Sequence, residues 1–169
     1  MDANELRAMQ APIKERYKSD AGAALITLRA KGTLDDQNIA CKVETGRALA
    51  VAGLHPATGG TGLELCSGDM LLEALVACAG VTLKAVSTAL AIPLKSGTVS
   101  AEGDLDFRGT LGVDNEASVG FRQIRLRFDV ATDVPQEKLD QLLKLTERYC
   151  VVYQTIRSGP AVEVSLNRM

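Results

Sequence analysis

The chain has 169 residues, of which 46% are hydrophobic, and a formal net charge of −2 at pH 7. A chain of this length can bury one sizeable core but is short for two independent domains. Its basic residues are scattered, so the charge pattern does not favour a nucleic-acid partner. We therefore expect a soluble protein with one domain over residues 1–169.

The first twenty residues carry a charge every few positions and no apolar stretch of signal-peptide length, so a cytoplasmic protein is the default expectation. Apolar side chains recur here at spacings of three and four, which predicts an amphipathic helix over residues 1–20 that is interrupted at Pro12. The residues of this stripe are Leu6, Met9, Ile13 and Tyr17.

Short β-prone runs fill residues 23–53. The runs 23–31 and 38–44 are separated by the turn-like sequence "GTLDDQ", which predicts a hairpin, and "RALAV" supplies a third strand. Cys41 alternates with polar residues and is expected to face the core. The following loop, "HPATGGTG", lacks the pattern of a phosphate-binding loop. It contains the only histidine of the sequence, His55, which we interpret as a solvated loop residue; the less favoured alternative is a catalytic base.

A nearly apolar stretch, "GDMLLEALVACAGVTLKAVSTALAI", predicts a central helix over residues 69–92. The uncharged run between Glu73 and Lys84 is too short to cross a bilayer, so we expect a buried helix and no membrane partner. Cys78 lies in its middle among small side chains, and two interpretations are open: a small hydrophobe in the core, or a reactive thiol.

The C-terminal half alternates strands with a second helix. Residues 97–130 show two segments with period-two alternation, including Val99 to Phe107, and predict an antiparallel pair. Asp133 and Gln136 form a capping-box signature for a helix over residues 134–149, and residues 161–168 predict a last strand. The order predicts an α+β fold with antiparallel sheets.

The four cysteines, at positions 41, 66, 78 and 150, include no CxxC pair, so a metal site is the weakest hypothesis, and no cofactor is expected. Cys66 lies where the loop meets the central helix and is either structural or activated by the helix N-terminus. Cys150 continues the apolar stripe of the second helix. If the two apolar helices pack side by side, Cys78 and Cys150 can approach each other, as a thiol peroxidase with a resolving cysteine requires.

The sequence resembles the OsmC/Ohr family of peroxide-handling proteins, in its OsmC-like branch, from about residue 23 to the C-terminus. The resemblance is carried by "GGTGLELCSGDMLLEALVACAGVTLKAV", "EGDLDFRGTLGV", "LLKLTERYCVVYQTI" and "VEVSL". It implies an intertwined homodimer whose antiparallel sheets wrap around two central apolar helices. It also implies reduction of organic hydroperoxides in oxidative-stress defence, with a dithiol such as a lipoylated protein as the reductant.

The resemblance assigns a peroxidatic role to Cys78 and a resolving role to Cys150. The family also uses an arginine of the N-terminal hairpin to hold the thiolate and an acid near the start of the central helix to orient that arginine. Arg29 is the candidate cation, with Arg47 as the alternative, and Asp69 is the candidate acid. Asp69 equally fits a charge favoured at a helix N-terminus. The rival hypothesis is a dimer that keeps the fold, has lost the activity, and binds a small molecule or a protein.

Overall fold

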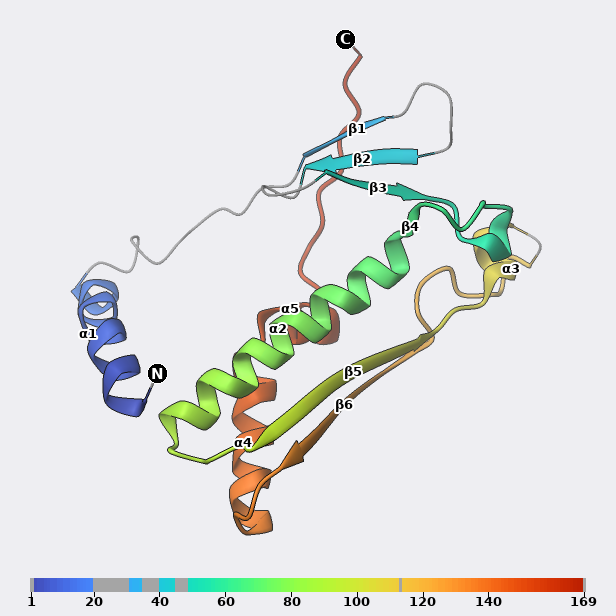
Figure 1. Cartoon of the computed structure of the whole chain (residues 1–169). Helices are drawn as coiled ribbons and strands as arrows, with labels where there is room; N and C mark the ends of the chain where they lie inside the picture. Colours follow the sequence, from blue (N-terminus) through green and yellow to red (C-terminus); the bar gives the residue numbers. More distant parts are fainter. Residues whose placement is uncertain (1, 20–30, 35–39, 45–48, 113, 169) are drawn as a thin grey trace.

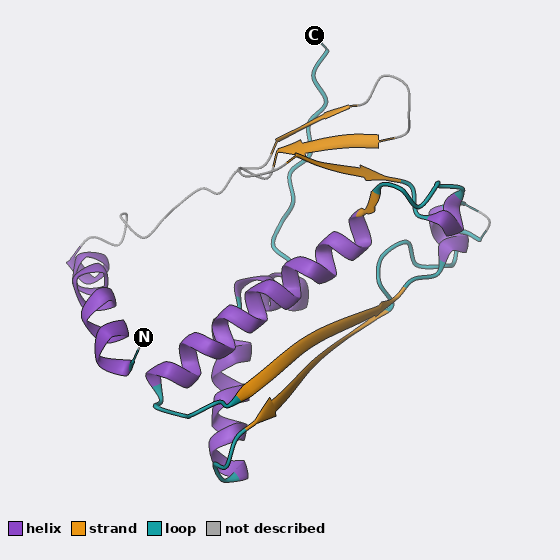
Figure 2. Cartoon of the chain, viewed as in Figure 1, coloured by secondary structure: helices purple, strands orange, loops and turns teal. Residues whose placement is uncertain are grey.

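The computed structural model describes residues 2–19, 31–34, 40–44, 49–112 and 114–168, and it mixes helices with two small sheets (Figures 1 and 2). In chain order the elements are α1 (Ala3–Ser19), β1 (Lys31–Leu34), β2 (Ala40–Glu44), β3 (Leu49–Gly53), a 3-10 turn (Pro56–Thr58), β4 (Leu65–Cys66), α2 (Ser67–Ala89), β5 (Ser96–Asp104), α3 (Phe107–Thr110), β6 (Gln123–Ala131), α4 (Gln136–Tyr149) and α5 (Val151–Ser158).

The central helix α2 organises the molecule (Figure 1). Its alanine- and leucine-rich sequence favours a helix, and Asp69 in its first turn complements the macrodipole. The helix ends because Ala91 adopts a left-handed conformation (φ +53°) while the amide of Ile92 bonds to the carbonyl of Ser87 at 2.8 Å, ahead of Pro93. The helix predicted over residues 69–92 is therefore confirmed and spans residues 67–89.

By length and composition, α2 is the one helix of the described residues that is apolar enough to cross a membrane. It instead packs within the chain against β5, α4 and α5. The buried side chains on its core face are Leu75, Ala79, Leu83, Val86 and Ser87.

The strands β5 and β6 form an antiparallel ribbon whose register runs from Ser96 opposite Ala131 to Asp104 opposite Gln123. One face of the ribbon is half-buried and the other exposed, as the alternating pattern predicts. The ribbon lies close to α2, since a Cβ on Gly80 would sit 3.6 Å from Val99. The first strand is shorter than predicted, because the side chain of Asp106 caps a new helix that begins at Phe107.

The N-terminal strands make a separate four-stranded sheet with the order β1-β2-β3-β4. The predicted hairpin exists, but its first strand occupies residues 31–34, which overlap the predicted strand only at Lys31 and otherwise fall in the segment expected to be a turn. Residues 23–30 lie outside the described part of the chain. The short strand β4 pairs in parallel with β3, so the sheet is not purely antiparallel.

The helix α4 follows the ribbon, and its capping differs from the prediction. Pro135 is the N-cap, which leaves Asp133 outside the helix, where it pairs with Lys95 at 2.5 Å. Gln136 donates a hydrogen bond to Asp140 one turn later and does not reach back to the cap. The capping-box prediction is wrong because proline, with its fixed φ, sets the helix start.

The last strand, predicted over residues 161–168, is absent. Residues 159–168 have no regular secondary structure, and Val162, Val164 and Leu166 are 80–99% exposed. The physical reason is that a strand is stabilised only by a neighbouring strand, and no described strand of this chain pairs with the segment.

Candidate functional site

Cys78 lies in the fourth turn of α2 and is half-buried. It sits beside the most buried face of the helix, which carries Leu75 and Ala79. One turn further on, the hydroxyl of Thr82 donates a hydrogen bond to the carbonyl oxygen of Cys78 at 2.8 Å. The thiol is therefore at the edge of the core and is not sealed within it.

Cys150 occupies the junction of α4 and α5, and it serves as the C-cap of the first helix and the N-cap of the second. Its backbone is extended (φ −74°, ψ 105°), so the chain turns there and α5 begins at Val151. The residue is 1% exposed. Because α2 packs against both α4 and α5, this junction lies against the part of α2 that carries Cys78.

The two cysteine thiols are neighbours, and each affects the pKa of the other. Burial acts to raise the pKa of Cys78, but the backbone amides of Val152 and Val151 and the thiol of Cys150 favour its thiolate, and the net effect is a lowered pKa. Burial raises the pKa of Cys150, and the neighbouring sulfur of Cys78 raises it further. The lowered pKa makes Cys78 the better nucleophile of the two.

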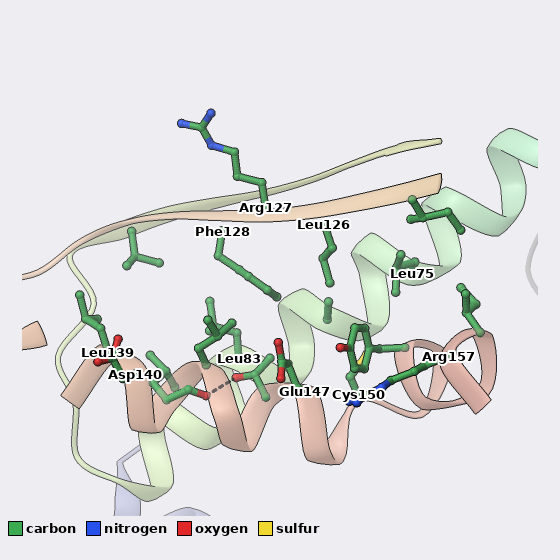
Figure 3. Close-up of a pocket in the computed structure, with 18 of the residues that line it drawn as sticks. Leu75, Leu83, Leu126, Arg127, Phe128, Leu139, Asp140, Glu147, Cys150 and Arg157 are labelled. Carbon is green, nitrogen blue, oxygen red and sulfur yellow. Dashed lines mark hydrogen bonds between the residues drawn. The ribbon is translucent and has the colours of Figure 1, made fainter. Parts of the chain in front are cut away.

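Beside Cys150 the chain forms a cavity of about 650 Å³ between β6, α2, α4 and α5 (Figure 3). Leu126 and Phe128 point into it from β6 and face α4 across the gap, with Leu83 of α2 between them (Figure 3). Arg127 projects from the opposite side of the strand, where it pairs with Asp129 at 2.7 Å (Figure 3). The cavity contacts Cys150 but is not lined by Cys78.

A second cavity of about 370 Å³, at the start of α2, brings together Asp69, Cys66 and His55. His55 has a structural role there: its Nδ1 accepts a hydrogen bond from the amide of Ala57 at 3.0 Å, and its ring stacks on Phe107. Asp69 is exposed and lies nine residues before Cys78, about 13 Å along a helix. Neither Asp69 nor Cys66 therefore contacts the thiol pair.

Arg29 and Arg47 lie outside the described residues, and so does the side chain of Cys41. The predicted cation is thus not placed. No group of three histidine, cysteine or acidic side chains among the described residues is arranged to hold a metal ion.

The thiolate-stabilising groups at Val151 and Val152 were missed from the sequence because they are backbone amides. The first amides of a helix have no partner within the helix and carry the positive end of its dipole. The signal was present in the sequence, since the apolar stripe of α4 breaks at Cys150 and a new helical segment follows. The valine side chains themselves gave no indication of this role.

Comparison with known proteins gives one family. The sequence model of the family described as "OsmC-like protein" matches residues 60–165, which contain both α2 and the α4–α5 junction. No curated protein matches the sequence.

Solved structures with a similar fold include an OsmC-like protein from Mycoplasma pneumoniae, with a TM-score of 0.65 and 14% identity over 79% of this chain and 89% of that one. An organic hydroperoxide resistance protein from Elizabethkingia anophelis has a TM-score of 0.63 and 18% identity over 80% and 91% of the two chains. Another, from Legionella pneumophila, has a TM-score of 0.61 and 18% identity over 80% and 92%. At these identities the likeness concerns the fold.

Proposed function

The chain belongs to the OsmC-like family, and from this premise we propose that it is a cysteine-based peroxidase that reduces organic hydroperoxides to alcohols in oxidative-stress defence. The observation that carries the proposal is the pairing of Cys78 with Cys150, whose pKa values move in opposite directions. Two proteins of similar fold are named organic hydroperoxide resistance proteins, which supports the substrate class. A cytoplasmic location is part of the proposal, since a reducing compartment keeps both thiols free.

The first chemical step uses the Cys78 thiolate. It attacks the terminal oxygen of the hydroperoxide, the O–O bond breaks, and the alkoxide takes a proton and leaves as the alcohol. Cys78 becomes a sulfenic acid. The amides of Val151 and Val152 favour the ionised sulfur that this step requires.

The second step uses Cys150. Its sulfur attacks the sulfenic sulfur of Cys78, hydroxide leaves and takes the thiol proton to become water, and a disulfide forms. Each peroxide thus consumes two thiols and yields one alcohol and one water. A dithiol reductant, such as the lipoylated protein that the family resemblance implies, then returns both cysteines to thiols.

Arg29 and Asp69 complete the proposed site by resemblance to the family. Arg29 would add a positive charge near the Cys78 thiolate, and Asp69 would orient Arg29. Asp69 stands at the first turn of α2, away from the thiol, so any effect on Cys78 runs through the arginine. Arg47 is the alternative cation.

The assembly that we propose is an intertwined homodimer, in which antiparallel sheets of both chains wrap around the central helices. Two observations support it. Among the described residues, large apolar side chains such as Leu63 and Val81 are at least 72% exposed, which favours association. Residues 162–166 alternate apolar and polar side chains, and none of the described strands pairs with them, as expected of an edge segment whose partner strand belongs to another subunit.

Turnover of cumene hydroperoxide with dihydrolipoamide tests the proposed function. Cys78→Ser is expected to abolish turnover, and Cys150→Ser to stop after one oxidation, with a sulfenic acid on Cys78. The matched control, Cys66→Ser, removes a half-buried thiol that lies 12 residues, about 18 Å of helix, from Cys78 and should retain activity. Near-normal turnover in both site variants would exclude the two-cysteine mechanism and favour the rival hypothesis of a binding dimer.

A further inference from the structure

The cavity beside Cys150 has the size and lining of a binding site for a small organic molecule. Its volume of about 650 Å³ lies in the range of ligand pockets. Leucine and phenylalanine side chains form much of its walls, and the charged residues that line it are Arg127, Asp140, Glu147 and Arg157 (Figure 3). An apolar molecule is therefore the occupant that the chemistry of the lining favours.

Of the two thiols, this cavity contacts only Cys150. In the proposed cycle the hydroperoxide reacts at Cys78, and Cys150 meets the sulfenic acid inside the protein. The reactant that reaches Cys150 from outside is the reductant of the disulfide. We propose that this cavity binds the apolar chain of a dithiol reductant and directs its thiolate to the Sγ of Cys150. This proposal rests on the proposed function, and it adds the cavity by which the reductant enters and the sulfur that the reductant attacks.

The chemistry balances as two thiol–disulfide exchanges. The incoming thiolate attacks Cys150, the Cys78–Cys150 bond breaks, and Cys78 leaves as a thiolate while Cys150 is held in a mixed disulfide. The second thiol of the reductant, after losing its proton, attacks the reductant sulfur of that mixed disulfide. Cys150 is released and protonated, and the reductant leaves as a cyclic disulfide. Two electrons pass from the dithiol to the protein.

The leaving group supports attack at this sulfur. Thiol–disulfide exchange is faster when the departing thiol has a lower pKa. Attack at Cys150 expels Cys78, whose thiolate is stabilised by the amides at the start of α5. Attack at Cys78 would instead expel Cys150, whose pKa is raised by burial.

Burial also limits the shape of the reductant. Cys150 is 1% exposed, so a slender chain that enters the cavity reaches it more readily than the surface of a folded protein does. The charged residues of the cavity include both signs, which favours a neutral polar end such as an amide over a carboxylate. A dithiol on a flexible aliphatic arm fits both requirements.

The first experiment maps the site of attack. The protein carrying Cys41→Ser and Cys66→Ser is oxidised with diamide, so the disulfide forms without a hydroperoxide. Excess 1-hexanethiol, an apolar monothiol that cannot complete the second exchange, is added, and iodoacetamide traps the released thiol. Peptide mass spectrometry should find the hexylthio group on Cys150 and the alkyl group on Cys78. The reverse pattern, or no disulfide between these cysteines, would overturn the inference.

The second experiment blocks the cavity. Leu143 lines it and is 42% exposed, while Lys144, the next residue of α4, does not line it. Leu143→Trp should slow reduction of the disulfide by dihydrolipoamide at least about tenfold relative to Lys144→Trp, an effect of about 1.4 kcal/mol on the barrier. Reaction of the reduced protein with cumene hydroperoxide should slow much less.

Three results of this comparison would overturn the inference. Equal rates of reduction in the two variants would mean that the cavity is not used. Equal slowing of both half-reactions would assign it to the hydroperoxide. A change in the oligomeric state of Leu143→Trp alone, measured as the mass of the assembly in solution, would mean that a second copy of the chain fills the cavity. A wild-type protein that is inert to hydroperoxide but behaves as expected in both reduction experiments would refute the peroxidase proposal and leave the reductant site standing.

Discussion

Among single residues, Cys78 shows how the fold sets the reactivity of a thiol. In its own helix the cysteine is flanked by small apolar side chains, which favour the neutral form. The amides that reverse this tendency belong to α5, more than 70 residues further along the chain. The sequence suggested which two cysteines to examine, but it did not show that a helix N-terminus would stand opposite one of them.

The pH dependence of Cys78 is the prediction at this scale. Because its pKa is lowered, the thiolate should persist at pH values where an ordinary thiol, with a pKa of about 8.5, is protonated. Alkylation of Cys78 by iodoacetamide, with Cys41 and Cys66 replaced and Cys150 kept, should therefore reach half its maximal rate below that pH, as followed by peptide mass spectrometry. Arg29→Ala should raise the pH at which alkylation is half-maximal, so the alkylation rate should fall more at pH 7 than at pH 9. Arg47→Ala should have a smaller effect on this pH. A wild-type midpoint at or above that of a free thiol would favour the binding-dimer hypothesis.

At the scale of elements, the predictable parts were those whose evidence is local. The central helix, the antiparallel ribbon and the second helix follow from apolar periodicity, and each lies within a few residues of its predicted range. The errors arose where a neighbour decides the structure. Asp133 pairs with Lys95 and caps no helix, and none of the described strands pairs with residues 161–168. Apolar periodicity indicates which face of a helix or strand is buried, but it does not indicate which other segment packs against that face.

The start of α5 supplies the prediction at this scale. Val151→Pro removes one of the two amides that favour the Cys78 thiolate, and proline is accepted at the first position of a helix after an extended residue such as Cys150. Interactions at a helix terminus contribute about 0.3–1 kcal/mol, so alkylation of Cys78 at pH 7 should slow roughly two- to fivefold. Val151→Ala, which keeps the amide, is the control. Equal alkylation rates in the two variants would argue against activation by α5.

At the scale of the whole molecule, the two sheets of one chain leave much apolar surface uncovered. Leu63, Val81 and the C-terminal residues Val162, Val164 and Leu166 are at least 72% exposed, a pattern that favours association. The family resemblance anticipated the mixed helix-and-strand fold, and residues 60–165 match the family. What the sequence could not provide is the placement of Arg29 and the identity of the strands beside residues 161–168, which depend on contacts far apart in the chain or between chains.

The prediction at this scale is an obligate dimer. Sedimentation at micromolar concentration should give twice the chain mass of 17.9 kDa, and dissociation should coincide with loss of secondary structure. Deleting residues 162–169, which removes the unpaired apolar segment, should weaken the dimer, while Ala161 and the preceding helix α5 stay in place. A folded monomer of the full-length chain would contradict the intertwined assembly.

The two-cysteine mechanism is tested most directly by one stoichiometry, measured in a single turnover. One equivalent of cumene hydroperoxide is mixed with the reduced protein, and thiols, alcohol and peptides are quantified after rapid quenching. We expect the loss of two thiols and the gain of one alcohol per peroxide, with a disulfide joining Cys78 and Cys150 and with Cys66 unchanged. Oxidation of Cys78 no faster than that of free cysteine, or a disulfide that involves Cys66, would contradict the two-cysteine mechanism.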